Sequence, residues 1–344
     1  MIRQCVERMT AYQPGEQPVA PAVVKLNTNE NPYPPSPRVA AALRALDAAW
    51  LRRYPDPDCA ELRKMLGRQH GCTPSQVFVG NGSDEILALC TRAFVENDGA
   101  IGYTVPSYSL YPVLAAMRGV EQRPVELGAD FGLVLPEDTT ASLFLLTNPN
   151  APTGIQYPRQ QVRRLCEAAA GVVVLDEAYV DFADDDGMGL ALELPNTIVA
   201  RTLSKSYSLA GLRLGYAVGP EPLIGALHKI KDSYNVDAAA QALAAAALSD
   251  RRSMKRNVMR IRATRERLSV ALREMGFSVY PSQTNFVWAE PGGMGAAELF
   301  AALRERGILI RYFDAPRTRA YVRITVGTDE EIDRLIAAIG ELLA

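Results

Sequence analysis

Between residues 77 and 219, short apolar runs alternate with longer segments in which apolar residues recur at helical spacing. The run at 172–175 is apolar at every position, which is typical of a parallel strand buried on both faces of a sheet. Repeated strand–helix alternation predicts an α/β fold, in which helices cover both faces of a mainly parallel sheet. The predicted strands are 77–79, 100–104, 142–146, 172–175, 197–200 and 215–219.

The helices of this region are predicted from apolar spacing and from helix-start residues. Ser36 followed by Pro37 is typical of a helix start. The glycine-containing turn at 80–85 follows the first strand and leads into another helix. The predicted helices are 36–50, 59–69, 86–95, a segment ending at Met117, and 158–169.

The pattern changes on both sides of this region, which predicts three parts of the chain. Residues 1–35 are rich in proline and asparagine and are expected to form an arm. Residues 36–250 form the predicted large domain, which ends with an alanine-rich helix at 238–248. A long charged helix at 251–275 opens a small α+β domain at 251–344, on which the arm is expected to pack. The other elements predicted there are strands 277–280, 285–288, 308–312 and 321–325, a helix at 296–306 and a closing helix from Asp329.

Composition excludes several kinds of protein. A formal charge of −2 over 344 residues gives no electrostatic reason to expect nucleic acid or an anionic membrane as a partner. The chain lacks a run of 18 apolar residues, so no membrane span is predicted, and its charged first ten residues do not resemble a signal peptide. The five cysteines are scattered and the two histidines lie far apart. We therefore expect a cytoplasmic protein with reduced thiols and without a metal site.

The most informative stretch is 200–216, where polar residues follow a predicted buried strand. Thr202, Ser204 and Lys205 stand at the carboxyl end of that strand, and Arg213 precedes the next apolar run. A lysine can form a Schiff base with a carbonyl group, while hydroxyls and a guanidinium can bind a phosphate. The pattern suits a carbonyl cofactor that carries a phosphate, and the alternative is a solvated lysine at a strand end. The chain has only six lysines, which disfavours surface filling modestly and leaves both explanations open.

The turn at 80–85 is a second candidate phosphate site. Gly82, Ser83 and Asp84 precede a predicted helix, and unpaired backbone N–H groups at a helix N-terminus favour an anion. The alternative is that Ser83 or Asp84 only caps the helix.

Three further side chains follow predicted strand ends and suit an aromatic cofactor. Asp176 can keep a pyridine nitrogen protonated, Tyr179 can donate to a phenolate oxygen, and Tyr108 can stack on a ring. Each also has an ordinary alternative: an aspartate bonded to backbone amides, a half-buried aromatic residue, and a core aromatic residue. One cofactor site explains them together, since open α/β sheets bind ligands beyond the carboxyl ends of their strands.

These residues occur in the order typical of a known family. The sequence resembles the fold-type-I pyridoxal-phosphate aminotransferases over nearly its whole length, and within them the histidinol-phosphate aminotransferase subgroup. Residues 26–32, 53–55 and 322–327 indicate the subgroup. The motifs that carry the family resemblance are Gly82-Ser83-Asp84, Tyr108, residues 150–154, residues 176–179, Ser204-Lys205 and Arg213.

The resemblance implies a large domain with a sheet of the seven-stranded type, a small domain, and a homodimer. It implies pyridoxal 5'-phosphate as the cofactor, joined to Lys205 as a Schiff base, with Asp176 on the pyridine nitrogen and Tyr179 on the ring hydroxyl. Tyr108 would stack on the ring. The residues implied to hold the cofactor phosphate are Gly82, Ser83, Thr202, Ser204 and Arg213, with Tyr54 entering from the partner subunit. Asp84 is also implied to belong to the cofactor site.

The resemblance also implies the reaction. Arg323 would bind the α-carboxylate of glutamate, while Tyr12, Asn27 and Arg311 would contact the substrate, Tyr12 and Arg311 at its distal phosphate or carboxylate. The expected reaction is ping-pong transfer of an amino group between histidinol phosphate and 2-oxoglutarate, in histidine biosynthesis. Two alternatives share the cofactor motifs: an aromatic amino-acid aminotransferase, because Arg311 can bind a carboxylate as readily as a phosphate, and a threonine-phosphate decarboxylase-like enzyme.

One position departs from the family pattern. Much of the superfamily has an asparagine immediately before Pro-Thr-Gly, where it contacts the ring hydroxyl, whereas this chain has Ala151. The neighbouring Asn150 is the expected substitute for that contact.

Two functions from other classes fit the sequence less well. A nicotinamide dehydrogenase is disfavoured because residues 211–215 lack the Gly-x-Gly-x-x-Gly spacing and precede a strand. A non-catalytic regulator with an aminotransferase-like domain needs a DNA-binding module, and residues 1–35 are too short and proline-rich to form one.

Overall fold

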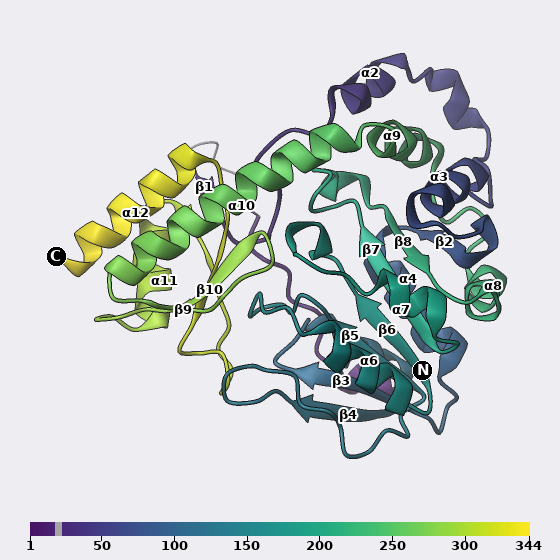
Figure 1. Ribbon diagram of the computed structural model, residues 1–344, viewed down its shortest axis with the longest axis horizontal. Coiled ribbons are helices and arrows are strands. Elements are labelled where there is room, and N and C mark those ends of the chain that lie inside the picture. The colour runs from purple at the N-terminus through teal and green to yellow at the C-terminus, as the bar shows by residue number, and fades with distance from the viewer. Residues whose placement is uncertain (18–22) are drawn as a thin grey trace.

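A seven-stranded sheet in the order β2-β8-β7-β6-β5-β3-β4 dominates the computed structural model, which describes residues 1–17 and 23–344 (Figure 1). Only β8 runs against the other strands, because it pairs antiparallel with both β2 and β7. The remaining strands therefore present their carboxyl ends at one edge. The strands are β2 (Val77–Gly80), β3 (Ala100–Val105), β4 (Glu121–Glu126), β5 (Leu143–Thr147), β6 (Val172–Asp176), β7 (Thr197–Thr202) and β8 (Gly215–Val218).

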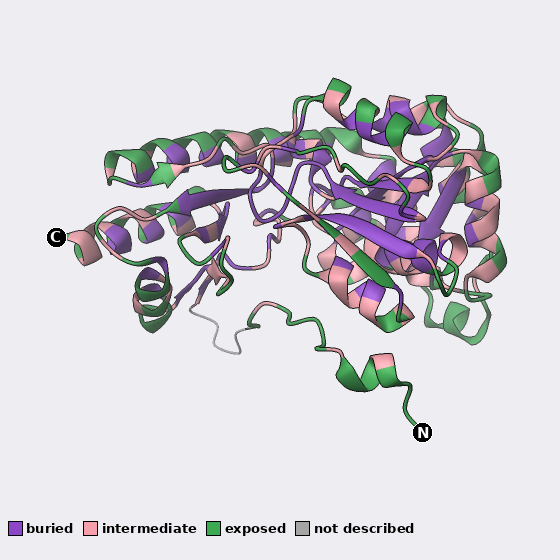
Figure 2. Cartoon of the chain, turned by 90° about the horizontal axis from the view of Figure 1, so that it is seen from below, coloured by how far each residue is buried: buried purple, intermediate pink, exposed green. Residues whose placement is uncertain are grey.

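Helices cover both faces of this sheet. Successive residues of a strand point to opposite faces, so a strand that is apolar throughout needs helices on both sides. Along β6, Val173 and Leu175 join one apolar cluster and Val174 joins another. Figure 2 shows the strands between these clusters as buried and the outer sides of the helices as exposed. The helices on the Val174 face are α4 (Gly82–Phe94), α5 (Leu110–Arg118) and α8 (Glu221–Ile230). Those on the other face are α2 (Pro37–Ala45), α3 (Ala60–His70), α6 (Arg159–Ala168), α7 (Met188–Glu193) and α9 (Ala238–Leu248).

A smaller antiparallel sheet in the order β12-β13-β10-β9 follows the long helix α10 (Arg251–Glu274) (Figure 1). This sheet packs with α10, α11 and α12 around a third apolar cluster. The arm joins the same part of the molecule, because β1 pairs in parallel with β11 and places Val24 opposite Ile308. The elements are β1 (Val24–Lys25), β9 (Ser278–Val279), β10 (Phe286–Glu290), α11 (Ala296–Glu305), β11 (Ile308–Leu309), β12 (Arg311–Tyr312), β13 (Val322–Thr325), α12 (Asp329–Leu343) and, near the N-terminus against α5, α1 (Gln4–Arg8).

Helices α1, α7 and α8 were not predicted from the sequence, and three further elements differ from those expected. The helix expected at 36–50 ends at Ala45, and Asp47 caps a separate 3-10 helix by accepting a hydrogen bond from the Ala49 N–H at 2.9 Å. The strand expected at 308–312 is two strands, since β11 pairs with β1 whereas β12 pairs with β13. Strand β4 escapes prediction because it is a polar edge strand that contains Pro124, and proline is tolerated at sheet edges.

The described ranges contain no helix that is both long and apolar enough to cross a membrane. All five cysteines are free thiols, and Cys59, Cys90 and Cys166 are buried. Burial raises the pKa of the Cys166 thiol to about 11, so this side chain packs as a neutral group.

Candidate active site

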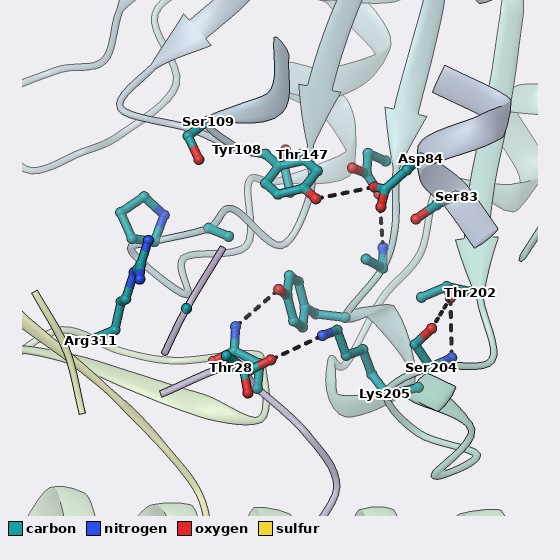
Figure 3. A pocket seen from close by; sticks show the side chains of 18 of the residues that line it. Thr28, Ser83, Asp84, Tyr108, Ser109, Thr147, Thr202, Ser204, Lys205 and Arg311 are labelled. Atoms are coloured by element: carbon teal, nitrogen blue, oxygen red, sulfur yellow. Dashed lines mark hydrogen bonds between the residues drawn. The ribbon is translucent and has the colours of Figure 1, made fainter. Parts of the chain in front are cut away.

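The polar residues that follow the strand ends meet in one cavity at the carboxyl edge of the large sheet (Figure 3). Tyr108 comes after β3, and Thr147, Asp176 and Thr202 end β5, β6 and β7. The arm and the smaller sheet complete the wall on the opposite side. The predicted site residues that line this cavity are Tyr12, Asn27, Ser83, Asp84, Tyr108, Asp176, Tyr179, Thr202, Ser204, Lys205, Arg213, Arg311 and Arg323.

Lys205 places its amine at the centre of this group. Its Nζ donates to the Thr28 carbonyl at 3.3 Å and lies 5.8 Å from the centre of the Tyr179 ring. Burial, and then the nearby positive charge of Arg323, lower the pKa of the Lys205 amine to about 8. An amine with this pKa is partly unprotonated near neutral pH, as a nucleophile or a base must be. Lys205 is therefore not the solvated lysine of the alternative explanation, because its amine is buried.

Asp176 is a buried carboxylate without a cationic partner among the described residues. Its Oδ2 accepts a hydrogen bond from the Tyr111 hydroxyl at 3.0 Å, and its Oδ1 accepts one from the Ala178 N–H at 3.2 Å. Burial raises the pKa of Asp176 to about 7, because a charge away from water is costly without a counter-ion. A protonated ring nitrogen in the cavity would supply that missing positive charge.

The first turn of α4 and the residues around Ser204 form a cradle for an anion. Helix α4 begins at Gly82, and Asn81 before it makes no capping side-chain bond. The first backbone N–H groups of a helix have no partner within the helix and favour an anion. A Cβ on Gly82 would lie 2.6 Å from Nη2 of Arg213. The Arg213 Nη1 donates to Ser204 Oγ at 3.4 Å, and Thr202 Oγ1 donates to the same oxygen at 2.9 Å. These contacts favour an anion site at this turn over the alternative that Ser83 or Asp84 only caps the helix.

Asp84 connects the cradle to the aromatic side of the cavity. Its Oδ2 lies 3.3 Å from Arg213 Nη2. Its Oδ1 accepts a hydrogen bond from the Tyr108 hydroxyl at 3.1 Å (Figure 3). Burial raises the pKa of Tyr108 well above its ordinary value, so this hydroxyl stays protonated and keeps donating. Asp84 thus fixes the orientation of both Arg213 and Tyr108.

Two arginines from the smaller sheet face the same cavity. Arg323 is held by one hydrogen bond from Nη2 to the Asn27 carbonyl at 3.1 Å, while its buried Nε has no partner among residues 1–17 and 23–344. Arg311 donates to the carbonyls of Gln13 and Pro14 in the arm, at 3.1 and 3.4 Å. Within the described part of the chain, neither guanidinium has a carboxylate within 4.0 Å. Two cations without counter-ions are a site for an anionic or dianionic ligand.

Three predicted site residues do not line the cavity. Gly82 lies just behind it, at the start of α4. Asn150 is fully buried, and its Nδ2 donates to the Pro106 carbonyl and to Thr153 Oγ1, while Ala151 faces the cavity instead. This geometry does not support the ring-hydroxyl contact expected of Asn150. Tyr54 is 80% exposed and stacks on Tyr234, outside the cavity of its own chain.

Comparisons with known proteins agree with this geometry. The family model described as "Aminotransferase class I and II" matches residues 21–339. The chain belongs to the class I and II aminotransferase family. It is 43% identical to the histidinol-phosphate aminotransferase of Microcystis aeruginosa, over 99% of this chain and 98% of that protein. It is 46% identical to histidinol-phosphate aminotransferase 1 of Bradyrhizobium diazoefficiens, over 98% of both chains.

A solved structure supports the same assignment. The histidinol-phosphate aminotransferase of Sinorhizobium meliloti, in complex with pyridoxal-5'-phosphate, superimposes with a TM-score of 0.88 and 27% identity, covering 99% of this chain and 97% of that one. The predicted α/β fold of this aminotransferase, with its mainly parallel sheet covered by helices, is confirmed.

This aminotransferase also has two site residues that the sequence did not single out. Tyr111 is fully buried beneath Asp176 and donates to it; the only sequence signal is its position three residues after Tyr108, which is equally typical of a core tyrosine. Asn29 is buried in a left-handed conformation with φ of 57°, and its Nδ2 donates to the Tyr179 hydroxyl at 3.0 Å. Asparagine adopts that conformation more readily than most residues. The sequence shows Asn29 only as one member of a polar motif and gives no sign of its contact with Tyr179.

Proposed function

We propose that this chain is a pyridoxal-phosphate-dependent aminotransferase that exchanges an amino group between histidinol phosphate and 2-oxoglutarate. The observation that carries the proposal is one cavity that combines a buried amine, a buried carboxylate, an anion cradle and two guanidinium groups. The described residues provide neither a cation for the carboxylate nor counter-ions for the guanidinium groups. The relatives named above support the substrate, and the neighbouring structure that contains pyridoxal-5'-phosphate supports the cofactor.

The donor set fits this cofactor. Its phosphate would be held by the first turn of α4 with Ser83, and by Thr202, Ser204 and Arg213, which carry hydroxyls and a positive charge. Asp176 would hold the proton on the ring nitrogen, and Tyr108 would lie against the ring. When bound, the pyridoxal group supplies an aldehyde that reacts with amines and a ring that withdraws electrons.

The residues of the chain perform the proton movements. The Lys205 amine, unprotonated in part because burial lowers its pKa to about 8, takes the proton from the substrate carbon next to the nitrogen and returns a proton when the amino group is transferred. General base catalysis of this kind contributes roughly 10²–10⁴-fold. Tyr179 is oriented by Asn29 and would donate its hydroxyl proton to the ring oxygen of the cofactor. Burial raises the pKa of Tyr179, so the hydroxyl keeps that proton.

Arg311 and Arg323 account for the two substrates of the reaction. Arg323 would bind the α-carboxylate of glutamate or 2-oxoglutarate, since its buried Nε has no partner. Arg311 and Tyr12 would bind the phosphate of histidinol phosphate or the distal carboxylate, with Asn27 beside them. A guanidinium is suited to both groups because it presents paired N–H donors.

The test is a parallel kinetic comparison of histidinol phosphate, phenylalanine and tyrosine as amino donors with 2-oxoglutarate. We expect the highest kcat/KM with histidinol phosphate, together with a spectrum of bound pyridoxal phosphate in the purified enzyme. A colourless protein that binds no pyridoxal phosphate contradicts the proposal as a whole. A preference for phenylalanine or tyrosine contradicts only the substrate.

A second candidate donor is an aromatic amino acid. The cavity continues into a more apolar one between the arm and α5, and Tyr12, Ser109, Arg311 and Phe313 line both. An aromatic ring bound there would contact Phe313 while its carboxylate used an arginine. The comparison above distinguishes this donor from histidinol phosphate.

We infer that the enzyme acts as a homodimer in which Tyr54 reaches the site of the partner. The inference is supported by the exposure of Tyr54 together with Leu43, Trp50 and Leu51 in one segment, because neighbouring exposed apolar residues are typical of an interface. The test mixes two weakened variants, Lys205→Ala and Tyr54→Ala. Heterodimers would contain one site with both native residues, so activity should recover on mixing. No recovery contradicts the shared site.

The proposed organisation is an arm at 1–35, a large domain at 36–250 and a small domain at 251–344. The pairing of β1 with β11 supports packing of the arm on the small domain. A cytoplasmic location remains a prediction from the scattered free cysteines.

A further inference from the structure

A chain of three hydroxyl groups ends on the carboxylate of Asp176. The Ser107 Oγ lies 3.2 Å from Thr147 Oγ1, which lies 2.5 Å from the Tyr111 hydroxyl, and that hydroxyl lies 3.0 Å from Asp176 Oδ2. Ser107 and Thr147 line the cavity, whereas Tyr111 is fully buried behind it. The chain therefore starts at the cavity wall and returns to Asp176 through the protein interior.

The direction of these hydrogen bonds follows from counting protons. An ionised carboxylate only accepts, so the single proton of the Tyr111 hydroxyl must point to Asp176. The Tyr111 oxygen can then only accept from Thr147, and Thr147 in turn accepts from Ser107. All three hydroxyl dipoles point toward the carboxylate, and such chains strengthen one another in a poorly solvated interior.

We propose that Tyr111, supported by Thr147, is a positioning residue that keeps Asp176 ionised and oriented for the ring nitrogen of the cofactor. This inference rests on the proposed binding of pyridoxal phosphate. Asp176 needs such support because burial opposes its charge, and the carboxylates of Asp84 and Glu177 nearby add to that effect. The backbone N–H of Ala178 is its other hydrogen-bond donor. The ring of Tyr111 packs edge-on against Tyr108 and at a tilt against Tyr103, which restricts where its hydroxyl points.

The experiment compares two ligands of the apoprotein: pyridoxal phosphate, and its analogue in which carbon replaces the ring nitrogen. Both carry the aldehyde and the phosphate, but only the first has a nitrogen for Asp176. In Tyr111→Phe, we expect the dissociation constant of pyridoxal phosphate to rise about tenfold, as for the loss of a hydrogen bond to a charged group. The analogue should bind this variant no more weakly than it binds the wild type. Equilibrium dialysis measures both constants without relying on turnover.

Tyr103→Phe is the matched control, because Tyr103 is a buried tyrosine beside Tyr111 whose hydroxyl donates to Gln122 instead. Both ligands should bind it as they bind the wild type. Thr147→Val replaces the hydroxyl that donates to Tyr111 by a methyl group of similar size. It should weaken the binding of pyridoxal phosphate selectively, but less than Tyr111→Phe does, and it decides the question if Tyr111→Phe does not fold. Equal weakening of both ligands, or of neither, overturns the inference. Failure of the wild type to bind pyridoxal phosphate overturns the proposed function itself.

Discussion

Arg311 and Arg323 lie directly opposite each other on the antiparallel strands β12 and β13. Their guanidinium carbons are 5.1 and 5.4 Å from the ring centre of the same residue, Phe313. Like charges at opposed positions of an antiparallel pair are destabilising, and the described residues offer these two no carboxylate partner. The binding of anionic ligands would relieve this repulsion.

The variant Arg311→Gln should therefore be more stable than the wild type but less active. Without ligand, we expect a small increase in the free energy of unfolding, on the order of 0.2–1 kcal/mol for removal of an opposed like-charge pair. The kcat/KM for histidinol phosphate should fall by roughly tenfold or more, because a charged hydrogen-bonding partner is lost. Urea unfolding and steady-state kinetics measure the two effects. Arg306→Gln, an exposed arginine outside the cavity, should change neither; a fall in stability for Arg311→Gln would contradict the repulsion.

Lys205→Ala should lose the absorbance band of the lysine-bound cofactor and slow proton transfer by roughly 10²–10⁴-fold. Added methylamine should restore part of the turnover, since a free amine can take the place of the missing base. Absorption spectra and kinetics with increasing methylamine check both effects. Lys255→Ala, an exposed lysine on α10, is the control. Turnover of Lys205→Ala at the wild-type rate would exclude the proposed role.

The rate at which the apoenzyme captures pyridoxal phosphate should depend on pH through Lys205. Only the neutral amine reacts, and burial followed by the charge of Arg323 lowers the pKa of this amine to about 8. The rate should rise as pH increases through about 8 and level off above it. In Arg323→Gln, the midpoint should move to higher pH, because one cation that disfavours the ammonium form is removed. Stopped-flow absorbance measures the midpoint, and an unchanged midpoint in this variant would show that Arg323 does not act on Lys205.

Gly82→Ala tests the backbone of the anion cradle. Gly82 has φ of 80°, and alanine in that region costs about 1–2 kcal/mol. The added Cβ, 2.6 Å from Arg213 Nη2, also displaces the guanidinium, so the affinity for pyridoxal phosphate should fall. Gly225→Ala in helix α8, where a Cβ meets nothing within 4 Å, should instead stabilise by about 0.5–1 kcal/mol. Denaturation curves and cofactor titration of the two variants give the comparison, and equal behaviour would refute the argument.

The large sheet was predictable because its central strands are apolar throughout and the residues after them are polar. Lys205 and Asp176 were found because the carboxyl ends of parallel strands meet at one edge. Arg213 was found because it stands shortly after Lys205 and just before the next apolar run. Strand β4 was not predicted, because it is an exposed edge strand that contains Pro124 and has no run of apolar residues. The two strands within 308–312 have different partners, and pairing cannot be read from five consecutive residues.

Side chains that act through another residue were the harder part of the site. Tyr111 has the apolar neighbours of any core residue on an amphipathic helix, and only the position of Asp176 reveals its role. Asn150 shows the reverse case: its place in a family motif suggested a contact with the ring, whereas its amide is already bound to Pro106 and Thr153. Local sequence does not specify which way such a side chain turns.

The pairing of β1 with β11 also determines when the site can form during synthesis. Val24 is translated before its strand partner Ile308, so the two cannot pair until residue 308 has emerged from the ribosome. The hydrogen bond from the Asn29 N–H likewise cannot form before Thr325 has emerged. Asn27 and Asn29 therefore reach their places only after translation has passed Thr325. A nascent chain that has Lys205 but not yet β11 and β13 lacks this wall of the site, so catalytic competence is delayed until those two strands are released.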